Sequence, residues 1–238
     1  VGWADAIILI PYRYDRLYRD ESLLRAVYPA MRRYAESMIR RSKRPGLLSA
    51  PRKNPYRRYT YSVGQHWGEW AEPKEDHFEG FLALGLPRPE EATAYLAYSM
   101  RCMADMARQL GFDRDAERYS AYADGAKKAY NYLFVKNDDI VTDRPAKLVR
   151  PLALGLLDEP AKTNVARRLA GVMRRRGFTV GTGFLSTPFL LGALSENGFA
   201  DVAFDTLLQE EPPGWLYQVR QGATTIWESW EGLRENGT

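Results

Sequence analysis

The chain contains very little cysteine and histidine. Cys102 is the only cysteine among 238 residues, and His66 and His77 are the only histidines. A single cysteine excludes an intrachain disulfide and a metal site built from several thiolates. The two histidines lie eleven residues apart, so the HExxH spacing of zinc hydrolases is absent. The sequence therefore predicts no thiolate or zinc centre, and because no EF-hand pattern for calcium is present we expect no metal site.

Long apolar runs and a strong charge of one sign are also missing. No apolar segment reaches the roughly 20 residues that a membrane-spanning helix needs, and no signal-peptide pattern is present. The formal net charge is only +4, and several basic clusters fall at expected helix C-termini, where they complement the helix dipole. We therefore expect no nucleic-acid partner and no membrane partner. Because the first residue is not Met, the localisation, cytoplasmic or secreted, stays unknown.

Helix signals dominate the chain. Apolar periodicity predicts eight helices, at residues 4–19, 21–41, 90–110, 113–134, 145–157, 160–175, 184–196 and 199–209. Asp20 and Asp113 are the expected N-caps, and Gly111 is an expected helix terminator. Residues 43–88 form a long irregular segment, and strand signals are limited to 140–141 and 179–180. Because the helices pair without a fixed repeat consensus, we predict an all-α toroid, formed by residues 1–238 as a single domain.

Three separated segments combine tryptophan with a carboxylate: residues 2–5, 64–72 and 214–231. In a helical toroid, alternate loops gather at one end, so we expect these segments to converge. Aromatic rings pack against the C–H face of a sugar ring, and carboxylates accept hydrogen bonds from hydroxyl groups. The pattern predicts a carbohydrate site, and the alternative is a set of tryptophans that only pack a core.

Glu228 is the strongest catalytic candidate, because it follows a Gly-Ala-Thr-Thr turn and lies between two indoles. The candidate substrate-binding residues are Trp3, Asp5, Trp67, Glu69, Trp70, Trp215, Tyr217 and Trp227. Asp5 could instead interact with a helix dipole, and Glu69 could be a loop carboxylate bound to nearby amides. Glu231 is expected in a supporting role, because two acids so close in sequence rarely supply both catalytic groups. Glycoside hydrolysis by two carboxylates needs no cofactor.

The segment GATTIWESW at residues 222–230 resembles the signature of the α-L-rhamnosidases of glycoside hydrolase family 78, as does the preceding PGWLYQVRQ at 213–221. Further similar segments are GWADA at 2–6, HWGEWAEP at 66–73 and VGTGFLSTPFLLGALSENG at 180–198. The resemblance implies an (α/α)6 toroid of the six-hairpin glycosidase type and inverting hydrolysis of terminal α-L-rhamnose. It also implies that Glu228 is the general base and that Trp3 and Trp70 are aromatic walls of the rhamnose pocket.

This chain departs from the family pattern in several places. The family carries Asp where this chain has Glu69. The family's general acid lies in an Arg-Asp-Glu-Arg-type loop upstream of the segment that begins here at Gly2, and its Asn-His-Tyr segment downstream of GATTIWE is missing. The eight expected helices compare with twelve in a complete toroid. We therefore expect the general acid to lie outside this chain, and the isolated chain to be nearly inactive.

An incomplete toroid would leave an apolar seam, through which the chain could self-associate. The expected partners are rhamnosides. Two alternatives stay open: a carbohydrate-binding toroid without turnover, and a helical scaffold whose tryptophans only pack.

Overall fold

The computed structural model describes residues 2–44, 54–73, 88–230 and 232. Two compact units divide the chain: unit 1 lies within Val1–Trp67 and Phe81–Val135, and unit 2 within Gly68–Gly80 and Lys136–Thr238. Across the described ranges, regular structure is helical except for one isolated bridge between Lys136 and Asp139. The all-α prediction is confirmed.

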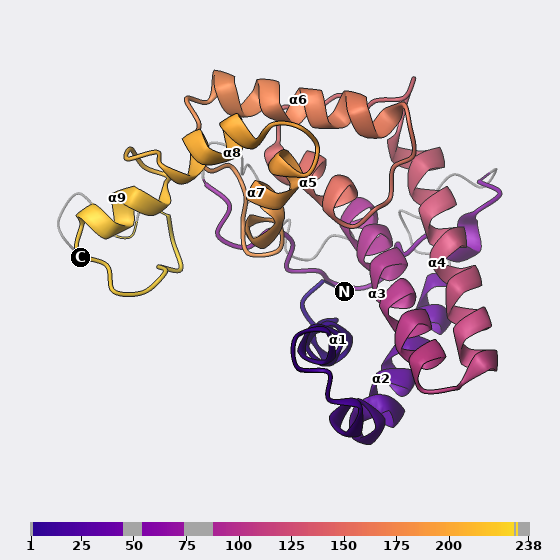
Figure 1. Ribbon diagram of the computed structural model, residues 1–238. Helices are drawn as coiled ribbons and strands as arrows, with labels where there is room; N and C mark the ends of the chain where they lie inside the picture. Colours follow the sequence, from indigo (N-terminus) through magenta and orange to yellow (C-terminus); the bar gives the residue numbers. More distant parts are fainter. Residues whose placement is uncertain (1, 45–53, 74–87, 231, 233–238) are drawn as a thin grey trace. The chain divides into compact units, whose positions relative to one another are not determined.

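Unit 1 is built from four α-helices in its described part: α1 (Ala6–Tyr18), α2 (Glu21–Ser42), α3 (Pro89–Gln109) and α4 (Asp113–Phe134), with a short 3-10 turn, η1 (Arg57–Tyr59). Helices α3 and α4 lie side by side as an antiparallel hairpin, and α1 and α2 pack against each other and against α3 (Figure 1). The core between them consists of apolar side chains at helical spacing, among them Ile8, Leu24, Met31, Leu96 and Met100, which are fully buried.

Capping residues explain where these helices begin and end. The predicted N-cap at Asp20 is confirmed, because its carboxylate accepts hydrogen bonds from the backbone N–H groups of Ser22 (3.1 Å) and Leu23 (3.2 Å). Gly111 follows α3 with φ of +77°, a left-handed conformation that glycine adopts without strain. The predicted cap at Asp113 is wrong, because Phe112 holds the N-cap position. Asp113 is the first helical residue, where its charge complements the helix dipole.

Unit 2 contains, within its described residues, α5 (Pro145–Ala153), α6 (Ala161–Arg175), α7 (Thr187–Ser195), α8 (Ala200–Leu207) and α9 (Trp215–Arg220). Helix α5 packs against α6 and α7, and α8 packs against α6 and α7 (Figure 1). Helix α9 is absent from the predicted set, because its six residues are too few for a periodicity signal.

The short strands predicted at 140–141 and 179–180 are wrong. The chain between α4 and α5 instead turns at Asn137 and Asp138, which have positive φ, and the backbone N–H of Val180 donates to the carbonyl of Pro213 at 2.8 Å. Of the predicted long irregular segment, residues 54–73 contain only η1 as regular structure. Residues 45–53 and 74–87, which include His77, lie outside the described residues, as does Glu231. None of the described helices combines the length and apolar character required to cross a membrane.

Candidate functional site

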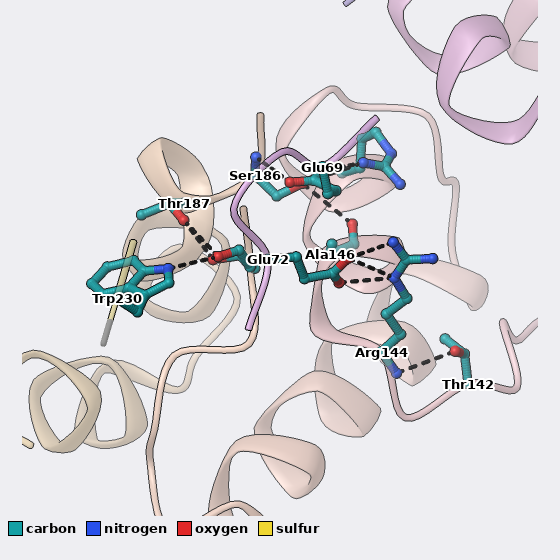
Figure 2. Close-up of polar contacts among 10 residues, drawn as sticks. Glu69, Glu72, Thr142, Arg144, Ala146, Ser186, Thr187 and Trp230 are labelled. Atoms are coloured by element: carbon teal, nitrogen blue, oxygen red, sulfur yellow. Dashed lines mark hydrogen bonds and ion pairs between the residues drawn. The ribbon is translucent and has the colours of Figure 1, made fainter. Parts of the chain in front are cut away.

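Glu69 of the predicted site is buried in an ion pair within unit 2. Its side chain is 1% exposed and its Oε1 contacts Nη1 of Arg150 on α5. Ser186, just before α7, donates its backbone N–H to Oε2 at 3.1 Å and its hydroxyl to Oε1. Figure 2 shows Glu69 beside Ser186 in this cluster. These contacts support the alternative in which Glu69 is a structural loop carboxylate.

Glu72 makes a second pair of the same kind three residues later. Its buried carboxylate faces Arg144, which immediately precedes α5, and Nε of Arg144 lies 2.8 and 3.0 Å from its two oxygens (Figure 2). The backbone N–H of Arg144 donates in turn to the hydroxyl of Thr142 at 3.2 Å. Two guanidinium–carboxylate contacts therefore attach the loop at 69–72 to both ends of α5.

The same loop lies directly against the segment that leads into α7. The backbone N–H of Phe184 donates to the carbonyl of Trp70 at 2.9 Å. A Cβ atom added at Gly183 would lie only 2.4 Å from that carbonyl oxygen. Position 183 therefore has to be glycine for the two backbones to approach this closely.

Trp230 anchors the segment at 222–230. It is buried, its indole N–H donates to the carbonyl of Thr182 at 3.0 Å, and the hydroxyl of Thr187 donates to the same oxygen at 3.2 Å. Figure 2 shows Trp230 and Thr187 directed at this one acceptor. The ring of Trp215 meets that of Trp230 edge-on, with 5.3 Å between centroids. Trp215 and Trp230 thus hold the segment in place by packing.

Glu228 differs from the two buried glutamates. Its side chain is exposed, and its Oε1 accepts a hydrogen bond from the indole N–H of Trp70 at 3.1 Å. The neighbouring Trp227 is half-buried and meets the ring of Tyr217 edge-on, with centroids 6.5 Å apart. The indole N–H thus orients the Glu228 carboxylate, and the exposed side chain remains accessible to water.

Gln218 on α9 supports the segment at 222–230, and sequence reasoning did not predict this role. Its Oε1 accepts the backbone N–H of Trp227 at 3.4 Å, and its backbone carbonyl accepts that of Ala223 at 3.0 Å. A single glutamine on a six-residue helix gives no sequence signal for this role. Arg150 and Ser186 were missed for a related reason, because they lie 81 and 117 residues from Glu69 in the chain.

The other three predicted residues belong to unit 1. Asp5 is fully buried, and its carboxylate accepts hydrogen bonds from the backbone N–H of Gly2 (2.6 Å), the hydroxyl of Ser99 (2.5 Å) and that of Tyr34 (3.2 Å). Burial raises the pKa of Asp5 above its ordinary value. These contacts favour a structural role for Asp5.

Trp3 is half-buried, whereas Trp67 is 52% exposed. The described residues of both units contain no group of three or more His, Cys, Asp or Glu side chains arranged to hold a metal ion.

Paired helices that carry aromatic and acidic loops define this chain as an all-α protein of helical hairpins, and comparison with known proteins specifies the family. The bacterial alpha-L-rhamnosidase six-hairpin glycosidase domain matches residues 1–238. The chain therefore belongs to this family, and the predicted fold, part of an (α/α)6 toroid, is confirmed.

Individual relatives agree with this assignment. An alpha-L-rhamnosidase of Streptomyces avermitilis is 28% identical over 99% of this chain, and one of an Alteromonas species is 27% identical over 96%. The crystal structure of the Streptomyces avermitilis enzyme complexed with L-rhamnose superposes with a TM-score of 0.79 at 27% identity, covering 98% of this chain and 20% of that one. The native enzyme of Aspergillus terreus gives a TM-score of 0.80 at 24% identity, covering 99% of this chain and 26% of that one. This chain spans 20% and 24% of the length of the two curated relatives.

Proposed function

We propose that this chain forms part of the catalytic domain of an inverting glycosidase that removes terminal α-L-rhamnose, with Glu228 as the general base. The observation that carries the proposal is the exposed carboxylate of Glu228, which Trp70 orients through its indole N–H. Family membership supports glycosidase chemistry in general.

The chemistry requires a carboxylate that water can reach. In an inverting glycosidase the base removes a proton from water as that water attacks the anomeric carbon, and a second carboxyl group protonates the departing oxygen. Glu228 is exposed to solvent, whereas the buried carboxylates of Glu69 and Glu72 form ion pairs with arginines. We propose that the general acid is supplied from outside this chain, in the upstream loop where the family carries it.

Aromatic side chains support sugar binding over a purely structural scaffold. Trp67 and Trp70 are 52% and 39% exposed. Covering the large apolar surface of an indole is favourable, so exposed indoles are suited to bind a ligand. We propose Trp70 and Trp227 as ring-packing residues next to Glu228, and Trp3 of unit 1 stays a predicted sugar-binding residue. Trp215 and Tyr217 would support the site through their edge-on contacts.

The proposal can be tested with a substrate that needs no general acid. In α-L-rhamnosyl fluoride, attack by water expels fluoride directly, and the proton of the water passes to Glu228. We expect the chain to release β-L-rhamnose first, as followed by proton NMR. Glu228→Gln should abolish this release, and the matched control Glu196→Gln, an exposed carboxylate at the end of α7, should retain it.

A second measurement separates the alternatives. Rhamnose should quench the tryptophan fluorescence of the chain, and Trp70→Ala should reduce this quenching. Quenching without any fluoride release would favour a binding domain without turnover, and absence of both would favour the scaffold. Release that survives in Glu228→Gln, or that yields α-L-rhamnose first, contradicts the proposed mechanism.

A further inference from the structure

Unit 1 carries a groove that the proposed chemistry does not use. It lies between α2 and the turn that joins α3 to α4, and has a volume of about 660 Å³, a size typical of small-molecule sites. Its lining combines arginines of α2 with the ring of Phe112, which is 42% exposed. The rings of Phe112 and Tyr28 lie together, with centroids 4.8 Å apart. The groove thus has an aromatic floor with cations beside it.

The acidic groups of the groove are already neutralised. Asp115 accepts from Nε of Arg32 at 2.8 Å and from the hydroxyl of Tyr28 at 3.0 Å. Glu36 accepts two hydrogen bonds from Arg118, both at 2.8 Å. The pKa of the Glu36 carboxyl is lowered by the hydrogen bonds from Arg118, so it stays ionised and paired.

The positive charges of two arginines in the groove are not balanced by an ion pair within the described residues. Arg33 and Arg40 both line it and are exposed, and neither has an acidic partner within the described part of the chain. They stand seven residues apart on α2, so they share one helix face with about 10 Å between them along the axis. The groove therefore offers two planar, permanently charged donors on one face of α2.

We propose that this groove binds an acidic saccharide, with carboxylate groups on Arg33 and Arg40 and a pyranose ring against Phe112. Guanidinium groups match carboxylates through paired hydrogen bonds, and the C–H face of a sugar packs on an aromatic ring. The choice of a saccharide rests on the proposed function, whereas the preference for an anion rests on the two arginines alone. A nucleic acid is disfavoured, since stable binding there uses many more phosphate contacts.

The test is calorimetric titration of the whole chain with a galacturonate trimer at neutral pH, with the uncharged galactose trimer as the control ligand. We expect saturable binding of the charged trimer alone, weakening as salt is added. Arg33→Gln and Arg40→Gln should each weaken it by about tenfold. Arg57→Gln removes the same charge from an exposed arginine outside the groove and should leave binding unchanged.

A second variant tests the aromatic floor. Phe112→Ser removes the ring and places a favourable N-cap residue at the start of α4, so folding should be preserved. This variant should bind the galacturonate trimer several-fold more weakly than the wild-type chain does. Its affinity for inorganic sulfate, measured in a separate titration of the same kind, should be unchanged. The proposal is overturned by equal binding of the neutral trimer, by tighter binding of a single-stranded oligonucleotide, or by an equal loss in Arg57→Gln. Rhamnose quenching should survive in the arginine variants, so failure here is distinct from failure of the proposed function.

Discussion

The loops at 68–72 and 227–230 each contain a glutamate next to a tryptophan, yet these two glutamates have opposite environments. Glu69 is buried against Arg150 and Ser186, whereas Glu228 is exposed and its carboxylate accepts a hydrogen bond from the indole of Trp70. The first arrangement uses the charge to hold a loop to α5 and α7. The second leaves the carboxylate of Glu228 accessible to water.

The comparison shows that a Trp/Glu motif does not by itself specify chemistry. A buried carboxylate with a buried guanidinium partner is an element of structure, because neither charge can be removed without stranding the other. A carboxylate fixed by one neutral donor at the surface can still take up a proton from water. Which role a glutamate has depends on what packs over it.

The largest effect is expected at the exposed acid. In any assay where hydrolysis is measurable, Glu228→Gln should lower kcat by about 10²- to 10⁴-fold, since it removes general-base catalysis. Its urea denaturation midpoint should match that of the wild-type chain, because the side chain is exposed. A large drop in stability with retained activity would reverse the roles assigned to the two glutamates.

The buried acid should show the opposite behaviour. Glu69→Ala removes the carboxylate that pairs with the guanidinium of Arg150, a side chain that is 3% exposed, and should lower the free energy of unfolding by about 3–5 kcal/mol. Urea denaturation followed by circular dichroism measures this change. The double variant Glu69→Leu with Arg150→Met should be distinctly more stable than Glu69→Ala. If both variants lose the same amount, the ion pair is not the reason for the loss.

Asp5 in unit 1 is a further buried acid. Its carboxylate accepts hydrogen bonds from a backbone N–H and two hydroxyl groups, whereas Glu69 is paired with an arginine. Because burial raises its pKa in the folded state, its contribution to stability is fully present below the unfolded value of about 3.9 and is lost as pH rises through the folded value. The free energy of unfolding of the wild-type chain should therefore fall, relative to that of Asp5→Asn, as pH rises from about 3.9 to the raised pKa of the folded state, and level off above it. Urea denaturation across a pH series tests this, and a constant difference between the two proteins would refute it.

A smaller effect is expected where the buried loop meets the chain leading into α7. The added Cβ of Gly183→Ala would clash with the carbonyl of Trp70 and should cost about 1–3 kcal/mol. Gly192→Ala on α7 is the matched control, because its Cβ meets nothing closer than 3.6 Å. It should raise stability by about 0.5–1 kcal/mol through helix propensity. Thermal unfolding of the pair checks both signs, and destabilisation by both variants would count against the proposed clash.

The helices could be predicted largely from local sequence. Apolar spacing of three and four residues placed α1 to α8, and Asp20 and Gly111 marked ends that the structure confirms. The errors fall where local signals are weak: the six-residue α9, the cap of α4 and two short strands. The grouping of Glu228 with Trp70 was anticipated, whereas the partners of Glu69 and the support from Gln218 were not.

The sequence by itself determined the helical pattern, the family and the identity of the aromatic and acidic loops, since these depend on the spacing of residues close together in the chain. Only the tertiary structure decided which acids are buried and paired and which stays open. The reason is physical: burial and ion pairing depend on groups that lie 81 to 117 residues apart and meet only after the helices pack.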